Sequence, residues 1–153
     1  MSRTVCSLLL GALLSSPALA AETLPKDAAP LAEADVTAIY AGNTVEWSGG
    51  AAYLAPDGKL TAYWSQKGEE GVGEGTWTVK DNEFCYTAAW QTVQKSFDEN
   101  FCWKVYRAAD ATWFEETRRS DGTDLKILSK GPAVSKGDNV SKQRQAMQLL
   151  VAK

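Results

Sequence analysis

The side chains best suited to chemistry in this chain are aromatic. The sequence holds six tryptophans, five tyrosines and four phenylalanines, and it contains no histidine. The lack of histidine excludes Ser-His-Asp and Cys-His catalysis, His-based zinc sites and a histidine pH switch. What remains is carboxylate, lysine or oxygen-ligated metal chemistry, or binding through aromatic surfaces.

Four aromatic residues are the candidate ligand-binding residues: Trp64, Tyr86, Trp90 and Trp103. Trp64, Trp77, Trp90 and Trp103 are evenly spaced along the chain. Their interval is about the length of one strand plus its connection. Such rings inside a barrel could hold a small apolar molecule, and exposed rings could stack on a saccharide. The same rings could equally fill the core, as side chains do in small barrels. The sequence leaves an open and a filled interior undecided.

The acidic residues give a weaker indication of function than the aromatic residues do. Glu115 and Glu116 adjoin Arg118 and Arg119, but neighbouring strand residues point to opposite faces, so they cannot flank a glycosidic bond as a pair. A solvated strand end with loose ion pairs is expected there.

A second acidic group comprises Glu69, Glu70 and Glu74 in a glycine-rich loop at 66–74. Its spacing matches no known calcium loop, so solvated charge is expected. We predict no catalytic residue, no metal site and no cofactor, and hence a protein that is not an enzyme.

One hairpin is specified most clearly, pairing Glu83–Trp90 with Asn100–Tyr106. Placing Cys85 opposite Cys102 puts the cysteines on one face by alternation. The other, interior face then carries Phe84, Tyr86, Trp90, Phe101, Trp103 and Val105. We predict a Cys85–Cys102 disulfide on the outer face; two free buried thiols are the alternative.

The first twenty residues have the three parts of an export signal: a basic start at Arg3, an apolar stretch over 5–14, and small residues at Ala18 and Ala20. We predict cleavage after Ala20 and localisation in the periplasm or outside the cell. No transmembrane segment is expected, since the apolar stretch is interrupted by Pro17. The net charge of −3 argues against a nucleic-acid partner.

After the signal (1–20), we predict a flexible N-terminus at 21–30, a barrel-like domain at 31–129 and a basic tail at 130–153. Residues 31–40 have a helical pattern, with Leu31, Ala34 and Ala38 on one side. The rest of the domain reads as eight antiparallel strands at Thr44–Trp47, Ala51–Ala55, Lys59–Ser65, Gly75–Lys80, Glu83–Trp90, Asn100–Tyr106, Ala111–Thr117 and Asp124–Ser129. Turn residues separate them. The fold class is therefore all-β, a small calycin- or lipocalin-like barrel or meander.

In the tail, Ser141 is predicted to cap a helix running to Ala152, with Met147, Leu150 and Val151 on a shared side. This basic helix packs against the barrel or frays; the alternative is contact with an anionic membrane.

Several motifs carry a family resemblance. The first motifs are Ala34-Asp35 and Ile39-Tyr40, followed by the segment 43–47. The segment 53–64 contains Pro56-Asp57-Gly58, and the segment 73–79 contains Gly75-Thr76-Trp77. The last matching residues are Phe84-Cys85, Trp90 and Cys102. Over about residues 33–128 this pattern resembles the exported proteobacterial family called domain of unknown function 995 (DUF995). The resemblance implies a Gram-negative source and hence the periplasm or secretion. The family has no established activity, so it assigns no residue a role.

The sequence thus favours an exported monomer that binds a small apolar or saccharide ligand, or associates with an envelope protein. An alternative is an interaction or inhibitor module that uses its outer face and the loops at 66–74 and 91–99. A carboxylate-dependent hydrolase is a third possibility, with no supporting motif.

Overall fold

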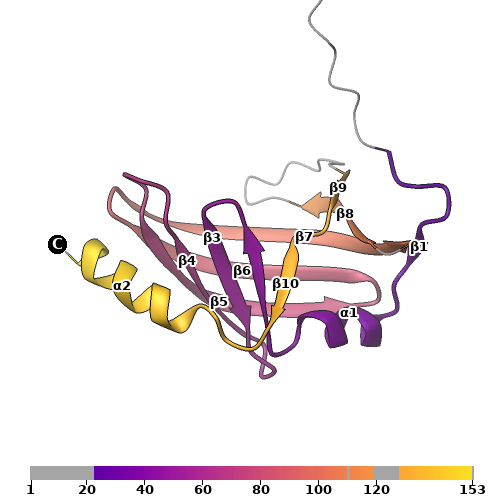
Figure 1. Cartoon of the computed structure of the whole chain (residues 1–153), viewed down its shortest axis with the longest axis horizontal. Helices are drawn as coiled ribbons and strands as arrows, with labels where there is room; N and C mark the ends of the chain where they lie inside the picture. Colours follow the sequence, from indigo (N-terminus) through magenta and orange to yellow (C-terminus); the bar gives the residue numbers. More distant parts are fainter. Residues whose placement is uncertain (1–22, 110, 119–127, 153) are drawn as a thin grey trace, which may run out of the picture.

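The computed structural model describes residues 23–109, 111–118 and 128–152. The predicted signal peptide at 1–20 lies outside these ranges, as do the predicted turn at 120–122 and most of the predicted strand Asp124–Ser129. The described chain forms a single antiparallel sheet that curls into a half-barrel, with one helix at its end and one on its outside (Figure 1). The prediction of a mainly antiparallel β fold is confirmed.

The elements follow one another as β1 (Ala29–Pro30), α1 (Glu33–Tyr40), β2 (Asn43–Trp47), β3 (Gly50–Leu54), β4 (Lys59–Trp64), β5 (Gly71–Lys80), β6 (Glu83–Thr92), β7 (Ser96–Ala108), β8 (Ala111–Arg118), β9 (Leu128–Lys130), β10 (Ala133–Lys136) and α2 (Ser141–Val151). The strand order is β10-β2-β3-β4-β5-β6-β7-β8-β9, and β1 pairs with β7 off this path. Consecutive strands are thus neighbours from β2 to β9, as expected for a meander.

The two edges of the sheet are connected by the chain itself. β9 and β10 stand at opposite ends of the strand order, yet only Gly131 and Pro132 separate them. The Cα atoms of Lys130 and Ala133 can therefore lie at most about 11 Å apart. The Gly131 N–H donates to the Thr112 carbonyl at 2.9 Å, which ties this connection to β8. The curled sheet consequently surrounds an interior.

Two loops are shorter than predicted. The expected loop at 91–99 is replaced by a tight connection, because β6 runs to Thr92 and β7 begins at Ser96. The expected loop at 66–74 ends early, because β5 begins at Gly71. Glycine and charged residues have low strand propensity. The backbone groups of residues 71–74 pair with both β4 and β6, and those of residues 96–99 pair with β6, and this pairing outweighs the local preference.

The register of the central hairpin is as predicted. Cys85 lies opposite Cys102, Phe84 opposite Trp103, and Tyr86 opposite Phe101. The two cysteines are at disulfide distance, with Cα atoms 4.1 Å apart.

Helix α1 is shorter than predicted, and a different set of its residues faces the core. It begins at Glu33 because the Leu31 N–H still donates to the Val105 carbonyl, at 3.0 Å, in the extended segment after β1. Ala34 and Ala38, predicted to share its inner side, are exposed, whereas Val36 and Tyr40 are fully buried. Val36 and Tyr40 are four residues apart on one helix face, and through them α1 packs on the sheet.

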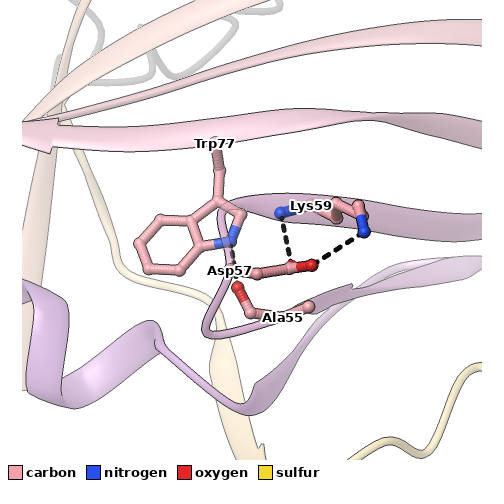
Figure 2. Close-up of polar contacts among 4 residues, drawn as sticks. All are labelled: Ala55, Asp57, Lys59 and Trp77. Atoms are coloured by element: carbon pink, nitrogen blue, oxygen red, sulfur yellow. Dashed lines mark hydrogen bonds and ion pairs between the residues drawn. The ribbon is translucent and has the colours of Figure 1, made fainter.

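The turn between β3 and β4 is held by its own residues (Figure 2). The Asp57 carboxylate accepts the Lys59 backbone N–H at 3.1 Å and forms an ion pair with the Lys59 ammonium at 2.8 Å. Gly58 has a φ of +84°, which glycine adopts without strain. The Trp77 indole N–H donates to the Ala55 carbonyl at 2.9 Å, fixing this turn to β5.

Helix α2 lies against the outer side of β4 and β5 (Figure 1). Its Arg144 guanidinium pairs with the Glu74 carboxylate of β5. Met147 and Val151 are half-buried, whereas Leu149 and Leu150 are 69% and 42% exposed. No helix in the described part of the chain is long and apolar enough to cross a membrane.

The N-terminus of α2 is capped by Asp138, not by the predicted Ser141. One Asp138 oxygen accepts the backbone N–H groups of Val140 and Ser141, at 2.9 and 3.0 Å, and the other accepts the Ser141 hydroxyl. Ser141 is itself the first helical residue, so its side chain cannot cap the turn that follows. Partial burial raises the pKa of Asp138, but these three hydrogen bonds together lower it below its usual value.

Replacing Asp138 with alanine is expected to lower the free energy of unfolding by about 1 kcal/mol, the usual contribution of such a cap. Because the folded-state pKa is lowered, the titrating part of this contribution is complete above the unfolded value of 3.8 and is lost as the pH falls through the folded value. Asp138→Asn should keep much of the cap but lose this pH dependence. Urea unfolding followed by far-UV circular dichroism at pH 3 to 7 tests both; equal stability of all three proteins would contradict it.

Candidate ligand cavity

The concave side of the curled sheet, together with Tyr40 of α1, forms an open cavity of about 730 Å³. Its volume lies within the range of roughly 300–1,000 Å³ that is typical of small-molecule sites. Side chains from β2, β3, β4, β6, β7 and β8 line it, together with Tyr40 of α1. The interior of this domain is therefore not completely filled by its aromatic residues.

The space arises because small residues occur in register across three strands. Ala52 of β3 pairs with Ala62 of β4, Ala62 pairs with Gly73 of β5, and Gly73 pairs with Trp90 of β6. A Cβ atom on Gly73 would lie 3.1 Å from the Trp90 indole, closer than ordinary van der Waals contact, so glycine leaves room for this ring to lie against β5. This small-residue row, defined as Ala52, Ala62 and Gly73, faces bulky side chains from β6 to β8 and leaves the cavity between them.

One wall of the cavity is a cluster of rings around Trp103. Its ring centroid lies 5.3 Å from that of Phe101, 5.5 Å from Tyr86 and 5.8 Å from Phe114. All four rings line the cavity. Rings fixed by such contacts lose little further freedom when a ligand packs on them, which favours binding.

Two further pairs of rings extend this lining. Trp47 and Trp64 lie 6.5 Å apart between centroids, and Trp90 and Phe97 lie 6.4 Å apart and stack. Phe97 is 38% exposed and carries the Lys95 ammonium 5.1 Å from its ring centroid, so this part of the lining reaches solvent.

All four residues proposed from the sequence line this cavity: Trp64 from β4, Tyr86 and Trp90 from β6, and Trp103 from β7. Trp90 is buried, and the other three are half-buried. The fold thus brings together side chains that are up to 39 positions apart in the sequence. Their role in binding remains a prediction.

The sequence interpretation missed Glu99, the polar group at the centre of the lining. One of its carboxylate oxygens, Oε2, accepts the Tyr86 hydroxyl at 2.6 Å and the Trp90 indole N–H at 2.9 Å. Glu99 lies in the expected loop at 91–99, yet it alternates with Phe97, Phe101 and Trp103 along one face of β7. That alternation was the signal that could have revealed it.

Tyr86 is kept protonated by its surroundings. Burial raises the pKa of its hydroxyl far above the ordinary value, and the negative charge and hydrogen bond of Glu99 raise it further, as does the charge of Glu116. At neutral pH Tyr86 therefore donates its proton to Glu99 and does not act as a base.

Glu116 is also placed differently from expectation. It is only 7% exposed and lies opposite Trp103, so the prediction of a solvated strand end is wrong for this residue. Glu115 points to the other face, as predicted for its neighbour on a strand, and accepts the Tyr106 hydroxyl at 2.8 Å. Glu116 shares the inner face of β8 with Phe114 because these two residues are two positions apart.

The α1 end of the cavity contains the Tyr40 hydroxyl. The Tyr40 ring packs 5.2 Å from Phe84 between centroids. Burial raises the pKa of Tyr40 far above its ordinary value, and Thr112 and Arg107 partly offset this rise. The hydroxyl has no partner with hydrogen-bond geometry in the described part of the chain, which leaves a neutral polar atom at this end.

The lining also contains charged residues that are exposed to solvent. Glu46, Glu69, Lys95 and Lys130 all contribute to it and are all exposed. We call these four residues the rim. Both signs of charge are present there, so the rim by itself favours neither anions nor cations.

The acidic groups that the sequence singled out do not converge on a cation. Glu70 accepts the Gly68 N–H at 2.9 Å, Glu74 pairs with Arg144 of α2, and Glu69 belongs to the rim. Among the described residues, the one close group of potential ligands is Glu83 with the two cysteines. Because these cysteines are at disulfide distance, their sulfurs are not offered to a metal ion.

Comparison with known proteins identifies a family. No curated protein and no solved structure matches the chain. A family model described as a protein of unknown function (DUF995) matches residues 7–148. This match extends past the resemblance seen over residues 33–128 and includes β9, β10 and most of α2. The chain therefore belongs to the DUF995 family.

Proposed function

We propose that this protein is an exported, non-enzymatic binding protein that holds a small, largely apolar ligand in its cavity. The observation that carries the proposal is the cavity of about 730 Å³ lined by Trp64, Tyr86, Trp90 and Trp103. An apolar ligand fits this lining because aromatic side chains supply large, rigid contact surfaces. A few polar groups, Glu99 foremost, would fix its orientation, as in most small-molecule sites.

Three features support export. The first twenty residues have the charge and hydropathy pattern of a signal peptide. The two cysteines that follow this segment are at disulfide distance, which fits an oxidising compartment. The resemblance to exported proteobacterial proteins points to the periplasm or secretion.

A neutral fluorescent probe, N-phenyl-1-naphthylamine, tests whether the cavity binds apolar molecules. We expect saturable binding at one site, detected by an increase in probe fluorescence. Trp90→Leu should weaken it by about tenfold, because it removes a large contact surface. Trp113→Leu is the matched control, since Trp113 lies on β8 but does not line the cavity, and its affinity should match that of the wild type.

Native mass spectrometry of the protein purified from its own envelope fraction supplies the second test. A reproducible additional mass that leaves on mild activation supports the proposal and measures the ligand's size. A bare protein that also fails to bind the probe would overturn it and favour an interaction surface on the outer face.

A further inference from the structure

We infer that the ligand of this cavity carries a cationic ammonium group, which pairs with Glu99, on an apolar body. This inference rests on the proposed function and specifies its ligand class. Four steps support it: the geometry of the Glu99 carboxylate, the charges of the lining, the nature of the surrounding rings, and the exclusion of other head groups.

The Glu99 carboxylate is held in a fixed orientation by hydrogen bonds to one of its two oxygens. Tyr86 and Trp90 both donate to Oε2, which fixes the plane and direction of the group. No described residue donates a hydrogen bond to Oε1. An ionised carboxylate accepts at both oxygens, so Oε1 remains as an acceptor for a donor supplied by the ligand.

The charge that lies deepest in the lining is negative. Among the described side chains of the lining, Glu99 is the only charged one that is not exposed. Both lysines of the lining, Lys95 and Lys130, belong to the exposed rim. The interior therefore attracts a positive charge and repels a negative one.

The rings around Glu99 add to this preference. Tyr86 and Trp90 touch its carboxylate, and the cluster around Trp103 continues the same wall. Aromatic faces attract cations, and the attraction grows when water is excluded. A carboxylate within aromatic walls is thus suited to an ammonium head.

Other head groups fit less well. A ligand carboxylate would meet the like charge of Glu99. An alcohol could donate to Oε1, but a hydrogen bond between two charged groups is roughly twice as strong as a neutral one. The Tyr40 hydroxyl is neutral and favours neither sign.

The test uses three competitors with the same alkyl chain: dodecylammonium, dodecanol and dodecanoate. Each displaces N-phenyl-1-naphthylamine from the full mature protein at pH 7. We expect dodecylammonium to bind about tenfold or more tightly than dodecanol, consistent with a charge-assisted hydrogen bond, and dodecanoate to bind most weakly.

Glu99→Gln locates the effect. Its amide oxygen can still accept from Tyr86 and Trp90, but the charge is gone and an NH₂ group replaces Oε1. Dodecylammonium should bind about 10- to 100-fold more weakly, while dodecanol should change by less than about threefold. Asp98→Asn is the matched control, because Asp98 is exposed on the outer face of the same strand; it should leave both affinities as in the wild type.

The outcomes separate the two proposals. If the probe does not bind at all, the proposed function fails. If the probe binds and the wild type does not prefer dodecylammonium, the ammonium inference is overturned and the apolar cavity stands. This wild-type comparison decides the question even if Glu99→Gln fails to fold.

Discussion

Replacing Cys85 and Cys102 together with alanine is expected to lower the free energy of unfolding by about 3 kcal/mol. The two residues are 17 positions apart, and a bridge closing a loop of about this length restricts the unfolded chain by roughly that amount in the chain-entropy model. The loss should be large in effect, because domains of this size are stable by only about 5–15 kcal/mol.

The bridge also matters for the site. The pair lies on the outer face of β6 and β7, the two strands whose inner faces hold Tyr86, Trp90 and Glu99. We therefore expect the variant to bind N-phenyl-1-naphthylamine with unchanged affinity at low temperature, but to lose binding earlier on heating.

Urea unfolding under oxidising conditions measures the change. Wild-type protein reduced by dithiothreitol serves as the matched control, since it lacks the bridge but keeps both side chains. A reduction below about 0.5 kcal/mol in both proteins, which is within the range of ordinary surface substitutions, would show that the bridge does not stabilise the fold.

The hairpin around this bridge was predictable because local rules fix it. Alternation along two strands and one pair of cysteines are enough to set the register, and every residue opposite a known partner then follows. Glu83–Trp90 and Asn100–Tyr106 were for this reason placed correctly, although both strands proved longer.

The cavity was not predictable in the same way. Its volume depends on Ala52, Ala62 and Gly73 meeting in register across β3, β4 and β5, and none of these residues carries a chemical signal. Three small side chains are noticed only when the sheet places them opposite large ones. Open and filled interiors use the same tryptophans, so composition could not distinguish them.

The two acids of the interior were missed for different reasons. Glu99 was assigned to a loop because charged residues are rare in strands. Glu116 was assigned to solvent because arginines follow it, although its spacing from Phe114 placed both on one face. In both cases alternation along the strand was the better guide to the face on which the side chain lies.

Ala62→Phe is expected to stabilise the protein and weaken its binding. Ala62 is fully buried and lines the cavity, with Ala52 and Gly73 beside it in register. The introduced ring would occupy existing space and bury apolar surface, which should raise the free energy of unfolding by about 1 kcal/mol after repacking. It would occupy the same space as a ligand, so probe affinity should fall by at least about tenfold, a loss of 1.4 kcal/mol in binding.

The opposite signs of these two effects are what make the variant informative. In a filled core the same substitution would overpack the interior and cost about 1–3 kcal/mol. Ala89→Phe is the matched control, because Ala89 is exposed on the outer face of β6, and there neither stability nor binding should change appreciably. Urea unfolding and probe titration of both variants distinguish the cases. A destabilised Ala62→Phe that binds the probe as tightly as the wild type would contradict this prediction.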